Sequence, residues 1–157
     1  MREIKRLANN FRNAIDTAFE KGELRKYPLF SRFPNECCDL TCDLLGQYLL
    51  ENGIETHQIN GVYRYDRSWH HVWLITNNNV IIDITEDQFL GKISSVKKFR
   101  NVHVGAEGEV QKQFDQNRRY EENTNFVDPN EFLGFAGQPN VRQRTLIELY
   151  RIICQYL

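Results

Sequence analysis

The sequence lacks any long uninterrupted apolar run, and its first 26 residues, MREIKRLANNFRNAIDTAFEKGELRK, carry a charge every few positions. This segment therefore has neither the pattern of a signal peptide nor that of a transmembrane span. We expect a cytoplasmic protein with no membrane partner. Export by a specialised secretion system needs no such signal and stays open.

Neither sign of charge predominates in the chain. Lys and Arg number 20 against 21 Asp and Glu, for a formal net charge of −1. No overall field attracts nucleic acid, so we expect none as a partner. Hydrophobic residues make up 41% and aromatic residues 12% of 157 residues, which predicts one folded domain over residues 1–157.

Cysteines are few, at four, and no two of them are spaced as C-x-x-C. A chain of this length needs no disulfides to fold, and a cytosol would reduce them. A zinc site would have to combine Cys38 and Cys42 with His70 and His71, yet adjacent histidines on a strand point to opposite sides. We expect neither a metal nor another cofactor.

Apolar residues at helical spacing predict three helices. One covers residues 4–19, one lies in RQRTLIELYRIICQYL at the end of the chain, and one runs over residues 37–52. Asn35 is placed to cap the third, and Gly53 follows its end. This third helix carries three of the four cysteines, and we expect it to be central and largely buried.

After Glu55 the residue pattern becomes typical of β-strands. The segments THQINGVYRY, HHVWLIT and VIIDIT are typical of strands, and the turn former Asn77-Asn78-Asn79 joins the last two into an antiparallel hairpin. A further short strand is predicted at RNVHV. The polar stretch 105–130 fits a short helix, a lid or a mobile loop, and the sequence does not decide among them.

The length of the hairpin turn sets which side chains meet. With a turn over residues 77–79, Thr76 faces Val80, and His71 and Asp83 fall on the same face as diagonal neighbours, about 7 to 8 Å apart at the backbone. His70 then points the other way. A two-residue turn would instead place His71 and Asp83 on opposite faces.

These predicted positions bring together the residue types that a cysteine nucleophile requires. A thiol attacks as the thiolate, which the partial positive charge of a helix N-terminus favours, and Cys37 and Cys38 lie at such a terminus. The nucleophile also needs a histidine base and a group that orients it, and the hairpin supplies His71 and Asp83. A carboxylate within the apolar run VIIDIT indicates a compensating partner.

Most cysteines in proteins are buried small apolar residues, and we assign that role to Cys42 and Cys154. Three polar residues after the last predicted strand either shape the mouth of a site or begin an acidic helix: Glu86, Asp87 and Gln88.

Residues 33–89 carry an ordered set of motifs that resembles a known family. The set is Cys38, Leu44-Leu45, Tyr48-Leu49, Gly53-Ile54, Ile59-x-Gly61-x-Tyr63, His71-x-Trp73 and Ile82-Asp83-x-Thr85. It resembles the bacterial transglutaminase-like branch of the papain-like superfamily. The resemblance implies Cys38 as nucleophile, His71 as general base and acid, and Asp83 as the orienting carboxylate, with a thioester acyl-enzyme.

Two positions depart from that pattern. Glu36 stands where the family often has a small residue, and the pair Cys37-Cys38 leaves the nucleophile open by one position. We favour Cys38, which shares the helical face of Cys42. The backbone N–H of the nucleophile is the natural oxyanion donor, and a second donor is not identified. Trp73 either walls a substrate channel or belongs to the core.

We therefore expect an α+β fold of the papain-like, transglutaminase-like type, with a central cysteine-bearing helix on a short antiparallel sheet and helices at both ends of the chain. The expected function is a cysteine hydrolase or acyl transferase acting on amide bonds of a peptide or protein substrate. Protease, amidase, deamidase and transglutaminase chemistry all stay open, as does the oligomeric state. The alternative is an inactive relative that serves as a peptide-binding module.

Overall fold

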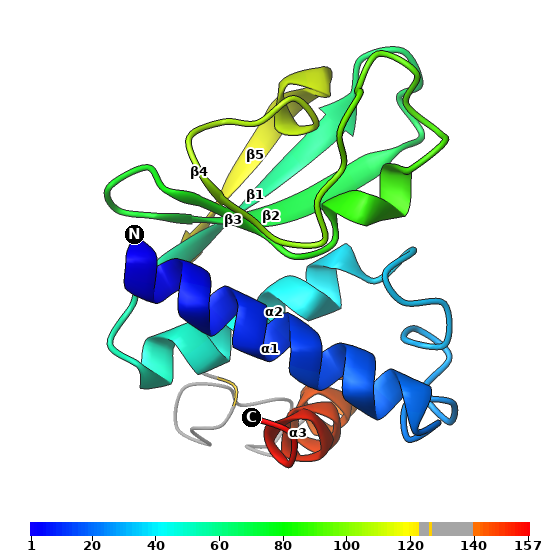
Figure 1. Cartoon of the computed structure of the whole chain (residues 1–157), viewed down its shortest axis with the longest axis vertical. Coiled ribbons are helices and arrows are strands. Elements are labelled where there is room, and N and C mark those ends of the chain that lie inside the picture. Colours follow the sequence, from blue (N-terminus) through cyan, green and yellow to red (C-terminus); the bar gives the residue numbers. More distant parts are fainter. Residues whose placement is uncertain (123–125, 127–139) are drawn as a thin grey trace.

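The computed structural model describes residues 1–122, 126 and 140–157, in which a layer of helices covers one face of a sheet (Figure 1). The helices are α1 (Arg2–Glu20), α2 (Cys38–Glu51) and α3 (Val141–Cys154). The strands are β1 (Thr56–Tyr63), β2 (His70–Thr76), β3 (Ile81–Asp83), β4 (His103–Gly105) and β5 (Phe114–Glu122), and two short 3₁₀ turns are η1 (Glu86–Phe89) and η2 (Gln111–Gln113). The expected α+β architecture is confirmed at this level.

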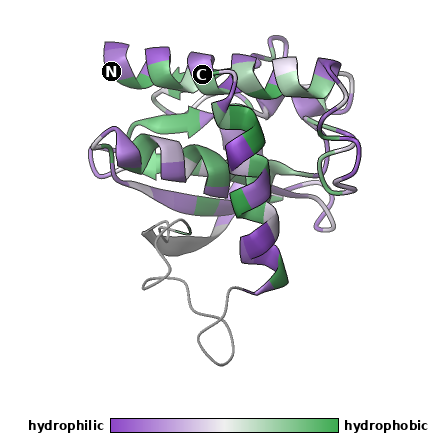
Figure 2. Ribbon diagram, turned by 90° about the horizontal axis from the view of Figure 1, so that it is seen from below, coloured by the Kyte–Doolittle hydropathy of each residue, from purple (hydrophilic) through white to green (hydrophobic). Residues whose placement is uncertain are grey.

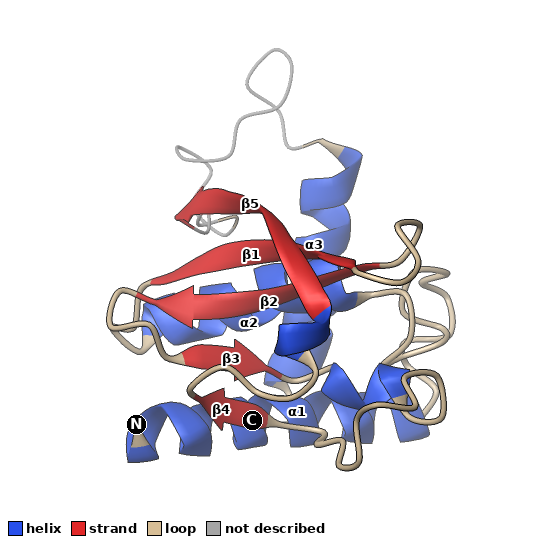
Figure 3. Ribbon diagram, turned by 90° about the horizontal axis from the view of Figure 1, so that it is seen from above, coloured by secondary structure: helices blue, strands red, loops and turns tan. Residues whose placement is uncertain are grey.

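The strands lie in the order β4-β3-β2-β1-β5, and every adjacent pair is antiparallel (Figure 3). Leu74 lies opposite Ile82 across β2 and β3, and the Thr76 N–H donates to the Val80 carbonyl at 3.0 Å. The three-residue turn and its register are thus confirmed. His71, Trp73 and Asp83 consequently share one face of the sheet by alternation.

The sheet separates two groups of buried apolar residues. The larger lies between the helices and the sheet face that carries Val72, Leu74 and Ile82, and the smaller lies on the other face, around Trp73 and Phe114. Figure 2 shows apolar and polar residues alternating along the helices, as expected for helices with one buried stripe. Each leucine fully buried there contributes about 1.5 to 3 kcal/mol.

Arg12 ties the first helix to the segment that carries the site. Its guanidinium, 6% exposed, donates to the Ile84 carbonyl at 2.7 Å and the Asn101 carbonyl at 3.1 Å. It also pairs with Asp87 at 2.8 Å and with Asp16 at 3.0 Å. Buried charge is tolerated here because each donor has an acceptor. The loop after β3 is therefore held at a fixed place on α1.

Two local expectations are corrected. The N-cap of α2 is Cys37, and no side chain of the described residues caps this helix; Asn35 instead accepts a hydrogen bond from Lys92. The sequence pattern also misses strand β5, because FDQNRRYEE lacks an apolar alternation and is joined to β1 at the edge of the sheet by its backbone. Residues 123–125 and 127–130 of the unassigned polar stretch lie outside the described residues. In the described part of the chain, no helix combines the length and apolarity needed to span a bilayer.

Candidate active site

A buried histidine and carboxylate meet on the outer face of the sheet. His71 is 0% and Asp83 1% exposed, and their Nε2 and Oδ2 atoms are 2.6 Å apart. The carboxylate can only accept when ionised, so the proton of this bond lies on Nε2. The diagonal relation that the turn length predicts thus becomes a direct contact, and the other ring nitrogen, Nδ1, is left for a second neighbour.

Two further donors hold the carboxylate of Asp83. The Thr85 N–H donates to Oδ1 at 2.9 Å, and the side-chain nitrogen of Gln111 donates to Oδ2 at 2.7 Å. Burial alone would raise the pKa of Asp83, but the His71 charge and these hydrogen bonds hold it below its usual range. Sequence reasoning misses Gln111, because it lies 28 residues away in a stretch without apolar periodicity.

The same interactions set the charge of the imidazole. Burial opposes the protonation of His71, but the charge and hydrogen bond of Asp83, together with the side chain of Cys38, raise the pKa of His71 to about 10. The site therefore favours an imidazolium at neutral pH. A protonated Nδ1 is a donor that suits an anion such as a thiolate.

The first turn of α2 brings Cys38 to this histidine. One turn further along the helix, the thiol of Cys42 donates to the Val72 carbonyl of β2 at 3.4 Å, which fixes the helix over the strand. Cys38 is half-buried and lines a cavity, whereas Cys37 is 0% exposed and accepts a hydrogen bond from Thr41. Of the two adjacent cysteines, only Cys38 is accessible from the cavity.

The other three thiols are poor nucleophiles. Burial raises the pKa of Cys37 to about 12, and it raises the pKa of Cys42 and Cys154 as well. Their burial in or beside the main core agrees with the roles that the sequence assigns to Cys42 and Cys154.

The cavity measures about 600 Å³ and lies where the start of α2, strands β1 and β2, and η1 meet. Its lining combines charged and aromatic side chains with one thiol: Glu36, Cys38, Asp39, Asn60, Ser68, Trp69, His70, Val72, Gln88, Phe89 and Lys92. A cavity of this size accommodates an extended side chain or a short peptide segment.

The tryptophan of the cavity is Trp69 rather than Trp73. Trp73 is 0% exposed, packs against Phe114 and does not line the cavity, so of the two roles considered for it the structure places it in the core and not in the wall of the cavity. Trp69 stacks between Tyr63 and Phe89, with ring centroids 5.2 and 6.5 Å away. Trp69 immediately precedes β2, and it packs on the same face of the sheet as Trp73, beside the outer group of apolar residues.

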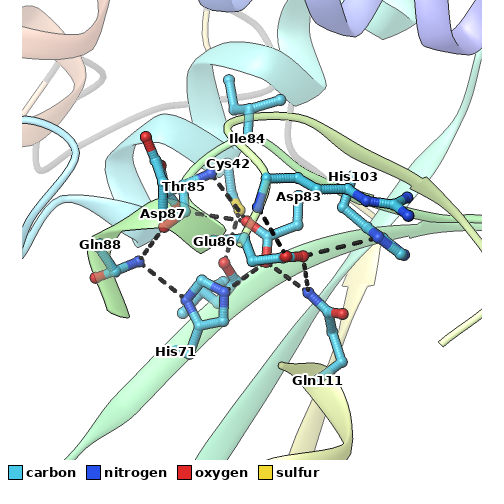
Figure 4. A network of polar contacts seen from close by, with 12 residues as sticks. Cys42, His71, Asp83, Ile84, Thr85, Glu86, Asp87, Gln88, His103 and Gln111 are labelled. Carbon is cyan, nitrogen blue, oxygen red and sulfur yellow. Dashed lines mark hydrogen bonds and ion pairs between the residues drawn. The ribbon is translucent and has the colours of Figure 1, made fainter. Parts of the chain in front are cut away.

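Gln88 is the second neighbour of His71. Its side-chain nitrogen lies 3.3 Å from Nδ1 of His71 and donates to the Thr85 carbonyl at 2.9 Å. Figure 4 shows His71 between Gln88 on one side and Asp83 on the other. Of the three polar residues after β3, Gln88 alone lines the cavity, while Asp87 binds Arg12.

Glu86 extends the polar network away from the cavity. It is buried, accepts from the Arg100 N–H at 3.1 Å and lies 3.7 Å from His103 and 3.5 Å from Gln111 (Figure 4). Burial and the nearby Asp83 charge raise the pKa of Glu86. Gln111 thus links the carboxylates of Asp83 and Glu86 in one hydrogen-bonded network.

His70 is exposed and His71 buried, so the two histidines of the zinc alternative point to opposite sides of β2. Among the described residues, no group of three or more His, Cys, Asp or Glu side chains is placed to hold a metal ion. Comparisons of the chain with protein-family models, with curated proteins and with solved structures found no match.

Proposed function

We propose that the protein is a thiol-dependent acyl transfer enzyme that acts on amide bonds, with Cys38, His71 and Asp83 as its catalytic triad. The observation that carries this proposal is the buried His71, bonded to Asp83 through Nε2 at 2.6 Å and turned with Nδ1 toward Gln88 of the cavity that Cys38 lines. A nucleophile, a base and an orienting group in that order are what covalent catalysis by a thiol requires.

In the proposed reaction Nδ1 of His71 takes the proton of the Cys38 thiol, and the sulfur attacks the carbonyl carbon of the amide. The Nδ1 proton then passes to the departing amine as the C–N bond breaks, which leaves a thioester on Cys38. Water, deprotonated by His71, hydrolyses the thioester to the acid and restores the thiol. A second amine in place of water gives transamidation.

The start of α2 supplies stabilisation for the tetrahedral oxyanion. No side chain of the described residues caps this helix, and Cys38 and Asp39 of its first turn both line the cavity. Backbone N–H groups at a helix start carry a partial positive charge and suit an oxyanion. The papain-like, transglutaminase-like family, suggested by the ordered motifs, performs this chemistry on peptide or protein substrates, and we extend that substrate class to this chain.

The first test is the pH dependence of iodoacetamide labelling, with the modified cysteine located by mass spectrometry. We expect labelling confined to Cys38, with a midpoint below that of an ordinary thiol, because the imidazolium of His71 stabilises the thiolate. In His71→Ala the midpoint moves to the range of an ordinary thiol, about pH 8.5. His57→Ala, which removes another strand histidine, one that hydrogen-bonds to Asn77, is the matched control and keeps the early midpoint.

The contrary result is slow labelling of Cys38 that rises only above about pH 8 in the wild type and does not change in His71→Ala. That result would favour the peptide-binding module without chemistry. A positive result is followed by incubation with a library of glutamine-containing peptides. Peptide cleavage, ammonia release and amine incorporation then separate protease, deamidase and transglutaminase activity.

A further inference from the structure

The side chain of Gln88 makes contacts that neither the triad nor the core explains. It is 8% exposed and lines the same cavity as Cys38. Its amide nitrogen, and not its oxygen, faces His71, because the Thr85 carbonyl accepts from that nitrogen at 2.9 Å and fixes the orientation of the carboxamide. One N–H is thus committed to Thr85, and the second is directed to Nδ1 of His71 at 3.3 Å.

The second N–H can bond to Nδ1 only while Nδ1 carries no proton. The Asp83 carboxylate keeps a proton on Nε2, so a neutral His71 has its lone pair on Nδ1 and accepts from Gln88. When the Cys38 proton arrives at Nδ1, two donors face each other and the bond is lost. The freed N–H remains anchored by Thr85 and borders the cavity in which the negative charge then develops.

We propose that Gln88 is a further catalytic residue, whose side-chain N–H bonds to Nδ1 of His71 whenever that nitrogen carries no proton, and to the oxyanion of the tetrahedral intermediate while His71 is the imidazolium. This inference rests on the proposed function and supplies the second oxyanion donor beside the backbone of Cys38. A donor that meets a full negative charge only when the oxyanion forms stabilises the transition state more than the ground state, which is the requirement for catalysis.

The test compares two reactions of Cys38 that differ in one respect. Acylation by p-nitrophenyl acetate passes through a tetrahedral oxyanion, with release of p-nitrophenolate, whereas alkylation by iodoacetamide displaces iodide and forms no oxyanion. Both are measured on the wild type, on Gln88→Leu and on Gln88→Met. The second variant keeps the length of the side chain, but it has neither an N–H to donate nor a charge. Gln47→Leu is the control, because it removes a buried carboxamide on a different element, α2, where Gln47 bonds to Glu51.

We expect both Gln88 variants to lower the acylation rate constant about 100-fold, the usual effect of removing one oxyanion donor. The alkylation midpoint should stay where it is or move to lower pH, because the neutral imidazole loses its hydrogen bond and the imidazolium is favoured. The Gln47→Leu control should match the wild type in both reactions.

Three outcomes would overturn the assignment. Equal loss of acylation and alkylation in the uncharged, size-matched Gln88→Met would show that Gln88 only maintains the shape of the site. Unchanged acylation in both variants, with rapid alkylation of the wild type, would remove Gln88 from the reaction and leave the triad in place. A wild type that neither acylates nor alkylates faster than a free thiol would overturn this inference together with the proposed function.

Discussion

Replacing Asp83 by asparagine tests the site most directly, because the structure dictates how the new side chain must lie. Oδ1 of Asp83 accepts a hydrogen bond from the Thr85 N–H at 2.9 Å. A backbone N–H can only donate, so the atom opposite it must be an acceptor. The amide oxygen of the introduced asparagine must occupy that position, and its NH₂ group then takes the place of Oδ2 and faces His71. Gln111 can accommodate this change by turning its carboxamide, since its Oε1 has no hydrogen-bond partner among the described residues.

The consequence for His71 is the wrong tautomer. Nε2 must now accept from the amide, so the proton moves to Nδ1, which can no longer take a proton from Cys38. Without the carboxylate, burial also opposes the imidazolium and the pKa of His71 falls from about 10 to below its ordinary value of 6.5. The corresponding change in a Ser-His-Asp triad lowers kcat about 10⁴-fold while the geometry is kept.

We therefore expect Asp83→Asn to lower the rate of acylation by p-nitrophenyl acetate by about 10³ to 10⁴-fold. The iodoacetamide midpoint of Cys38 should rise toward that of a free thiol, because the imidazolium that stabilises the thiolate is lost. The variant should remain folded by circular dichroism. A folded Asp83→Asn protein with an unshifted midpoint would refute the reasoning, because Asp83 would then not control the imidazole.

Three more predictions concern stability. The His71 pKa lies above its ordinary value, so the stability from the pair is fully present below about pH 6.5 and is lost as pH rises through about 10. Because the pKa of Asp83 is lowered, its contribution to the free energy of unfolding is present above about pH 4 and is lost in acid. The free energies of unfolding of the wild type and Asp83→Asn should therefore differ most between about pH 4 and 6.5. A difference that grows toward pH 10 would contradict this prediction. Gly61→Ala should lower the free energy of unfolding, measured in urea, by about 1 to 3 kcal/mol, because a Cβ there would lie 2.8 Å from ring carbons of Trp73. An unchanged free energy of unfolding would show that the sheet accommodates the methyl group without strain. Arg12→Met should cost about 3 kcal/mol, because Asp87 and two carbonyls lose their buried donor; a loss below about 1 kcal/mol would mean that water replaces the guanidinium.

The prediction of the hairpin succeeds because its information is local. Strand alternation and an odd turn length are enough to place His71 and Asp83 on one face, and the register confirms this. The apolar spacing of the cysteine-bearing helix likewise predicts that element. Its N-cap is not predicted, because Asn35 and Cys37 are both compatible with a helix start and only the path of the preceding loop distinguishes them.

Residues that act on the site from a distance could not be found in the same way. Gln111 reaches Asp83 across 28 residues, and nothing in the polar sequence around it marks a strand or a turn. Trp69 and Trp73 are both close to His71 in the sequence, yet only the fold shows that the first lines the cavity and the second is buried against Phe114. Their environments depend on the edge strand β5, which joins the sheet through backbone hydrogen bonds and leaves no apolar pattern.

The sequence by itself determined the three helices, the β2–β3 hairpin, the α+β class and the placement of His71 and Asp83 on one face of the sheet, because periodicity and turn length act between neighbours in the chain. The tertiary structure decided which of Cys37 and Cys38 reaches the cavity, which tryptophan lines it, and that Gln88 and Gln111 bond to the two members of the His71 and Asp83 pair. Those choices depend on how α2, η1 and η2 pack against the sheet. Such packing joins residues far apart in the chain, and no local pattern encodes it.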